Sequence, residues 1–223
     1  MSDYQLPSTF EEFSEARRNG FLKAKAIKDA GGKIAGVFCT FSPCEIFDAA
    51  DIHTVGLCGT SDKTIGAAES ELPKNLCPLI KSSYGFALTQ KCPYTYFADI
   101  LIGETTCDGK KKMYEMLSEL KDMHVMQLPQ GVDRPYAKQM WTSEIHYLIE
   151  VLEKKFGVTI TDEKLRKACA VSVTANARLE CVLWSYRNRF RRLPIQRICT
   201  MFWMVPISVL TVMSLLNPLK KWR

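Results

Sequence analysis

The sequence predicts an α/β fold, with an open and mostly parallel sheet that carries helices on both faces. Short apolar runs rich in β-branched residues alternate with helical segments between residues 33 and 157. Apolar residues make up 47% of the 223 residues, which is enough to form a substantial core. Strands that alternate with helices in this way usually form a parallel sheet covered on both sides.

The first predicted element is helical. Ser8 and Glu11 form a capping-box pattern, and Gly31 with Gly32 can end the helix that follows. Residues 9–30 are therefore predicted to form one or two surface helices, and residues 1–32 to form an N-terminal helical segment.

The α/β domain is predicted to span residues 33–168. Its expected strands are short apolar runs bounded by turn residues, at 33–41, 54–59, 98–104 and 124–129. The segments between them have the spacing or the flanking residues of helices, at 43–51, 77–90, 109–123 and 134–157.

The net charge of +6 belongs to the end of the chain. Residues 169–223 hold nine basic residues and one acid, so the remaining residues are slightly acidic. This distribution gives no support for a nucleic-acid surface on the folded body. The first 20 residues lack the apolar core of a signal peptide, so we expect a cytoplasmic protein with reduced thiols.

The nine cysteines are an odd number, which argues against a complete disulfide framework. No two of the six in the body form a CxxC pair, so a zinc finger is not expected. Cys39, Cys77 and Cys107 each lie near a predicted strand end or helix start, which face one crevice in an open α/β sheet. Three thiolates there can hold an iron–sulfur cluster, although each cysteine could instead be small apolar filler, as we interpret Cys44 and Cys58.

A family resemblance sharpens this hypothesis. The segments "GVFCTFSPCEIFDAAD", "NLCPLIKSSYGFAL", "KCPYTYFADILIGETTCDGKKKMYEM" and "LPQGVD" closely resemble the 2-hydroxyacyl-CoA dehydratase D-component family. This family includes benzoyl-CoA reductase subunits and double-cubane cluster proteins, and the double-cubane branch is the most similar. The resemblance covers about residues 8–168.

The resemblance implies an iron–sulfur cluster, either [4Fe-4S] or a double cubane. Its implied ligands are Cys77 and Cys107, with Cys39 in the double-cubane branch and Cys92 as a weaker candidate. It also implies a homo- or heterodimer, an ATP-dependent iron–sulfur activator protein, and an acyl-CoA or other small-molecule substrate. One low-potential electron would then drive a radical dehydration or a reduction. No catalytic residue is implied.

The tail at 169–223 differs in composition, and two hypotheses account for it. A shifted reading frame after Ala168 would truncate the family fold and replace its second half, which would impair activity. Alternatively, the uncharged segment 198–216 is long enough to cross a membrane and would anchor a non-enzymatic α/β interaction subunit.

Lys110, Lys111 and Lys112 are expected to form a solvated helix face, or else to attract an anionic thioester or an acidic partner surface. The histidines at 53, 124 and 146 are expected to be structural or surface residues.

Overall fold

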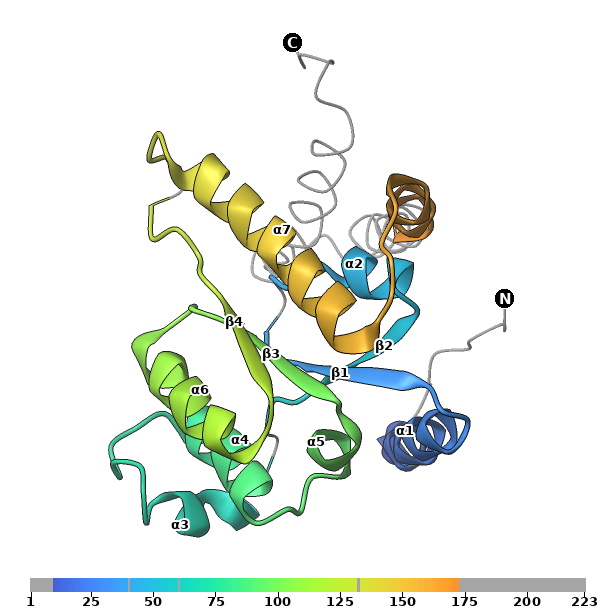
Figure 1. Ribbon diagram of the computed structural model, residues 1–223. Helices are drawn as coiled ribbons and strands as arrows, with labels where there is room; N and C mark the ends of the chain where they lie inside the picture. Colours follow the sequence, from blue (N-terminus) through green and yellow to red (C-terminus); the bar gives the residue numbers. More distant parts are fainter. Residues whose placement is uncertain (1–9, 40, 60, 132, 173–223) are drawn as a thin grey trace, which may run out of the picture.

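The computed structural model describes residues 10–172, except residues 40, 60 and 132. Its centre is a sheet of four parallel strands in the order β2–β1–β3–β4 (Figure 1). The strands are β1 (Lys33–Val37), β2 (Ile52–Gly56), β3 (Ile100–Glu104) and β4 (Met123–Met126). The predicted α/β fold with a parallel sheet is therefore confirmed.

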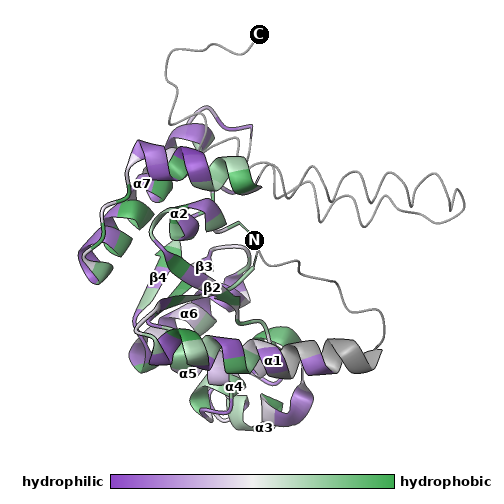
Figure 2. Ribbon diagram, turned by 90° about the vertical axis from the view of Figure 1, so that its right-hand side faces the viewer, coloured by the Kyte–Doolittle hydropathy of each residue, from purple (hydrophilic) through white to green (hydrophobic). Residues whose placement is uncertain are grey.

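Helices cover both faces of this sheet. They are α1 (Phe10–Asp29), α2 (Cys44–Ala49), α3 (Ile65–Ala68), α4 (Pro78–Leu88), α5 (Pro93–Phe97), α6 (Asp108–Leu120) and α7 (Ala137–Phe156), with a 3-10 turn at Asp62–Thr64 and a last helical stretch at 162–172. One face carries α2 and α7, and the other carries α1 and α3 to α6 (Figure 1). Figure 2 shows the same three layers from the side.

Alternating side chains of the central strands build two separate cores. Ala35 of β1 and Ile102 of β3 face the core under α7, which also receives Leu148 and Leu152. The residues next to them in each strand point to the other core, as Leu101 does. A strand buried on both faces needs apolar residues at every position, and this requirement explains the continuous apolar run of β3.

The two central strands, β1 and β3, form the topological switch point of the sheet. The chain leaves β1 toward β2 on one side, then crosses back over β1 to form β3 on its other side. At such a point the two loops after the carboxyl ends of the strands run in opposite directions and leave a crevice between them. The backbone continues this contact past the strands, since Phe38 N donates to Ile102 O at 2.9 Å.

The structure differs from the sequence prediction mainly in the shortest elements. The single turns α3 and α5 were not predicted, because four or five residues show no helical period. The first strand ends at Val37 rather than residue 41, since Cys39 adopts a left-handed backbone with φ of 66° that cannot continue a strand. The N-terminal segment forms one helix, α1.

Within residues 10–172, no helix is long and apolar enough to cross a membrane. The segment 198–216, on which the membrane hypothesis depends, lies outside the described residues, as does most of the tail that the frameshift hypothesis concerns.

Candidate iron–sulfur site

The carboxyl edge of β1 ends in a turn that carries Cys39. The left-handed backbone at this residue is uncommon for a side chain other than glycine. The Cys39 sulfur lies 3.8 Å from Thr106 Oγ1, which belongs to the loop after β3. It also accepts a hydrogen bond from Lys110 Nζ on α6. Cys39 therefore lies at the switch point, between the ends of the two central strands.

Cys107 and Cys77 each occupy the residue before the first turn of a helix. Cys107 is the N-cap of α6, and Cys77 is the N-cap of α4 with Pro78 following it. Both side chains are exposed, and neither sulfur accepts a hydrogen bond from its own helix. The positive end of a helix dipole favours a negatively charged group at this position. Both sulfurs are therefore available to an external group.

The first turns of α4 and α6 pack against each other. A methyl group added to Gly109, two residues after Cys107, would lie 2.7 Å from Ile80 Cδ1 and 3.0 Å from Leu76 Cδ1. Leu76 and Ile80 flank Cys77 in the sequence. An added methyl group would press on the ends of both side chains, so glycine at this position lets the two helix starts lie close together. The structure thus brings the neighbourhoods of Cys77 and Cys107 to one edge of the sheet.

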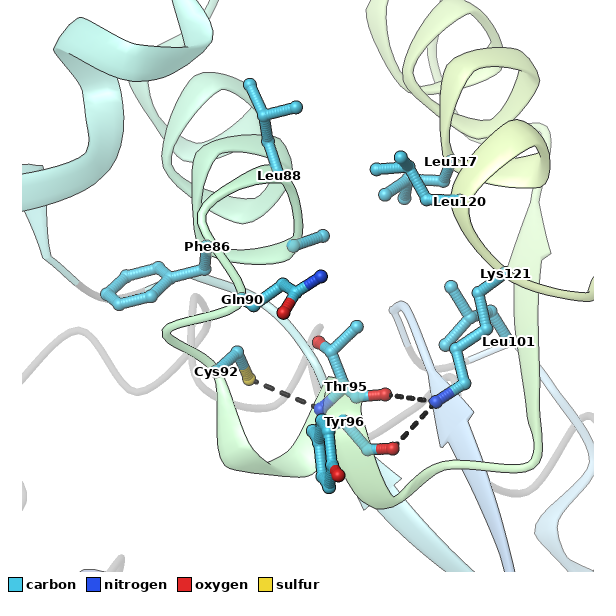
Figure 3. A pocket seen from close by; sticks show the side chains of 11 residues that line it. Phe86, Leu88, Gln90, Cys92, Thr95, Tyr96, Leu101, Leu117, Leu120 and Lys121 are labelled. Atoms are coloured by element: carbon cyan, nitrogen blue, oxygen red, sulfur yellow. Dashed lines mark hydrogen bonds between the residues drawn. The ribbon is translucent and has the colours of Figure 1, made fainter.

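Cys92 lies at the other end of these helices. Its sulfur accepts a hydrogen bond from Thr95 N at 3.4 Å and so caps α5, the helix that precedes β3. It lines a cavity of about 290 Å³ together with Leu120 and Lys121, which end α6 (Figure 3). A helix as long as α6 separates its two ends by roughly 20 Å. The structure therefore does not place Cys92 with the other three candidates.

Glu104 is the last residue of β3, and it is fully buried at the carboxyl edge. Its Oε1 accepts hydrogen bonds from Ser42 N at 2.5 Å and from Ser42 Oγ at 2.7 Å. Its Oε2 has no hydrogen-bond partner within the described residues. Burial raises the pKa of this carboxyl above its ordinary value, although the bonds from Ser42 oppose the shift. Glu104 ties the end of β3 to the loop that carries Cys39.

Lys110 and Tyr114 lie beside Glu104 on the buried side of α6. Burial by itself lowers the pKa of Lys110, but the hydrogen bond to Cys39 and the charges at Cys58 and Glu104 leave it raised. Burial is also the main reason why the pKa of Tyr114 is raised, and its hydroxyl has no partner among the described residues. The carboxyl edge thus holds buried polar groups whose hydrogen-bonding capacity is not fully used among the described residues.

The interpretation of Cys44 and Cys58 as buried filler was wrong. Both are exposed: Cys44 begins α2, and Cys58 lies in the loop after β2. The apolar run "TVGLCG" suggested a longer strand, but β2 ends at Gly56, two residues earlier. Cys58 lies close enough to Lys110 for its charge to affect the pKa of that amine.

The donor chemistry of this edge fits an iron–sulfur cluster. Thiolates are the usual ligands of such clusters, and Cys77 and Cys107 present free thiols at adjoining helix starts. Within the described part of the chain, however, no three His, Cys, Asp or Glu side chains already stand together as a metal site. The three thiols share an edge of the sheet, and a cluster would have to draw them together.

Glu104, Ser42 and the buried position of Lys110 were missed at the sequence level. For Glu104 there was a signal, because it ends the apolar run 98–104, which is predicted to be a buried strand. An acid in such a strand is rarely buried without a specific partner, so it marks a position with a special role. For Lys110 the signal was helical phase, since it lies three, four and seven residues before Met113, Tyr114 and Leu117, which are all buried. For Ser42 there was no such signal.

Comparison with known proteins decides the family. The model of the family "2-hydroxyglutaryl-CoA dehydratase, D-component" matches residues 39–215. The chain belongs to this family. It is 52% identical over 166 residues to "Putative dehydratase subunit YjiM" of Escherichia coli (strain K12), and 27% identical over 150 residues to the "(R)-phenyllactyl-CoA dehydratase beta subunit" of Clostridium sporogenes.

These alignments also show what share of each relative's length this chain covers. They cover 74% and 66% of this chain, but only 43% and 39% of the two relatives. The chain thus spans less than half the length of the curated relatives it matches. The resemblance was predicted to end near Ala168. The family match instead continues to residue 215.

Proposed function

We propose that this chain is an iron–sulfur subunit of a dehydratase or reductase that acts on 2-hydroxyacyl-CoA thioesters or related small molecules. One observation carries the proposal: the first turns of α4 and α6, each preceded by an exposed cysteine, pack together at the carboxyl edge of the sheet. This is the edge at which parallel α/β proteins bind their ligands.

Cys77 and Cys107 are the primary ligands in this proposal, and Cys39 is the third. A [4Fe-4S] cluster or a double cubane bound there would supply low-potential electron transfer and an open iron that acts as a Lewis acid. The helix starts of α4 and α6 favour the negative charge of the thiolates. Cys92 is not part of this ligand set, because its sulfur caps α5 at the far end of α6.

The residues of the chain itself prepare the edge in two ways. Glu104 accepts both hydrogen bonds from Ser42 and so fixes the turn that presents Cys39. The rings of Phe38 and Tyr114 pack against each other with centroids 5.5 Å apart and an interplanar angle of 46°, and both side chains are buried. An apolar environment that excludes solvent is one means by which a protein sets the redox potential of a cluster.

The family relationship supports a proposal about partners. We propose an assembly of two subunits, a separate ATP-hydrolysing activator that delivers one low-potential electron, and a cytoplasmic location with reduced thiols.

The test is anaerobic reconstitution of the full chain with ferrous iron and sulfide. The wild-type chain is expected to turn brown and to bind iron and sulfide in comparable amounts, measured by absorption and by chemical analysis. The double variant Cys77→Ser/Cys107→Ser should lose most of the iron, whereas the matched control Cys92→Ser should keep it. A wild-type chain without iron, or a double variant that binds as much as the wild type, would overturn the proposal.

A further inference from the structure

The three consecutive lysines at the start of α6 have different surroundings. Lys111 and Lys112 point outward and pair with Asp108 at 3.1 Å and with Glu115 at 2.9 Å. Lys110 is only 7% exposed. It therefore does not belong to the solvated face that the sequence predicts, and it is poorly placed to attract an anionic partner from solution. A lysine is rarely buried unless it has a specific partner.

The partner of Lys110 is the sulfur of Cys39, which is 71 residues away in the sequence. Lys110 Nζ donates a hydrogen bond to Cys39 Sγ. Thr106 Oγ1 lies 3.8 Å from the same sulfur. Glu104 and Cys58 are the other groups close enough to act on the ammonium by their charge. A single cation thus lies among two sulfurs and a carboxyl group at the switch point of the sheet.

We propose that Lys110 is a positioning residue of the iron–sulfur site: its buried ammonium holds the Cys39 sulfur at the carboxyl edge and keeps a positive charge beside it. This inference rests on the proposed function. Lys110 lies on the same buried face of α6 as Met113, Tyr114 and Leu117, so its side chain is directed into the fold and not toward solvent.

A fixed cation beside a cluster ligand has a definite electrostatic consequence. Reduction of the site adds one electron and therefore one negative charge, which a neighbouring ammonium stabilises. Hydrogen bonds to ligand sulfur act in the same direction, and both are known means of tuning such sites. Lys110 therefore makes the site easier to reduce, whereas Lys111 and Lys112, which are exposed and paired with acids, do so far less.

The experiment compares Lys110→Met, Lys110→Arg and Lys112→Met with the wild type, all as reconstituted full chains. A redox titration with titanium(III) citrate gives the midpoint potential, since each Ti(III) releases one electron and becomes Ti(IV). Lys110→Met should shift the midpoint to a more negative value and bind less iron. Lys110→Arg, which keeps the charge and a donor, should restore most of both, and Lys112→Met should match the wild type.

The outcomes separate this inference from the function on which it rests. If the wild type binds iron but Lys110→Met shows the same midpoint and the same iron content, the role of Lys110 is refuted while the proposed function stands. A wild type without iron overturns both. Circular dichroism identifies a misfolded variant, and in that case Lys110→Gln, which keeps a polar group without the charge, takes the place of Lys110→Met.

Discussion

The two edges of the central sheet differ in how completely their buried polar groups are paired. At the amino edge, Asp99 Oδ1 accepts from Lys28 Nζ at 2.7 Å, and Asp99 Oδ2 accepts from Ile34 N at 2.9 Å. Lys121 Nζ nearby donates to two carbonyl oxygens of α5. At the carboxyl edge, Glu104 Oε2 and the Tyr114 hydroxyl are buried without a partner among the described residues.

This difference supports the proposal that the functional site lies at the carboxyl edge. Buried polar groups in folded proteins are nearly always hydrogen-bonded, so an unpaired group needs a reason. The groups named at the amino edge meet this rule, although His124 Nε2 in β4 is also buried without a partner among the described residues. The carboxyl edge departs from it at the switch point, where Cys39 also lies.

The largest effect is expected from Gly103→Ala at the carboxyl edge. The added methyl group would lie 2.5 Å from Tyr114 Cζ, so the buried Tyr114 ring would have to move. Overpacking of this kind costs typically about 1–3 kcal/mol, and we expect the upper part of that range, as measured by urea unfolding. Gly56→Ala is the matched control at the end of β2, because its methyl group would meet nothing within 4 Å. Equal stability of the two variants would contradict the packing described for Tyr114.

A smaller effect is expected from Asp99→Ala at the amino edge. The change removes the ion pair with Lys28 and leaves Ile34 N without its acceptor, which together should cost about 1–2 kcal/mol because both groups are only part-buried. The iron content after reconstitution should stay at the wild-type level. A loss of iron without a loss of stability would show that the two edges are not independent.

Glu104→Gln should change the pH dependence of stability rather than its overall size. The raised pKa of Glu104 means that the folded state binds this proton more tightly than the unfolded state does. Its contribution to stability therefore falls as the pH rises above the ordinary value of 4.5, and Gln removes this loss. Relative to the wild type, the variant should gain stability between pH 4 and pH 8 in urea titrations.

Glu69→Gln provides the control of opposite sign. The hydrogen bond from Lys81 lowers the pKa of Glu69, so its contribution is present above the ordinary pKa and is lost as the pH falls. This variant should lose stability relative to the wild type as the pH rises. If both variants show the same trend, the assignment of an unfavourably buried carboxyl to the carboxyl edge is wrong.

The smallest effect is expected from Lys112→Ala. Its ion pair with Glu115 is exposed at both ends, and such helix pairs are worth about 0.3–0.5 kcal/mol. The loss should decrease further in 1 M salt, because surface charges are screened there. A loss above 1 kcal/mol in urea unfolding would mean that the outward face of α6 packs against something.

Much of the fold could be read from local patterns. The apolar run ending in Glu104 predicted β3, and the residues Cys77 and Cys107 were correctly placed at helix starts. The limits of β1 and the turns α3 and α5 could not be predicted, because they depend on one left-handed residue and on helices too short to show a period.

The sequence by itself determined the α/β class, the family and four candidate cysteines, since periodicity and motifs are properties of neighbouring residues. Only the tertiary structure decided that Cys92 lies apart from Cys39, Cys77 and Cys107, and that Lys110 alone among three lysines turns inward to Cys39. Contacts between residues 71 positions apart arise from the order of the strands and the packing of the helices, which no local pattern contains.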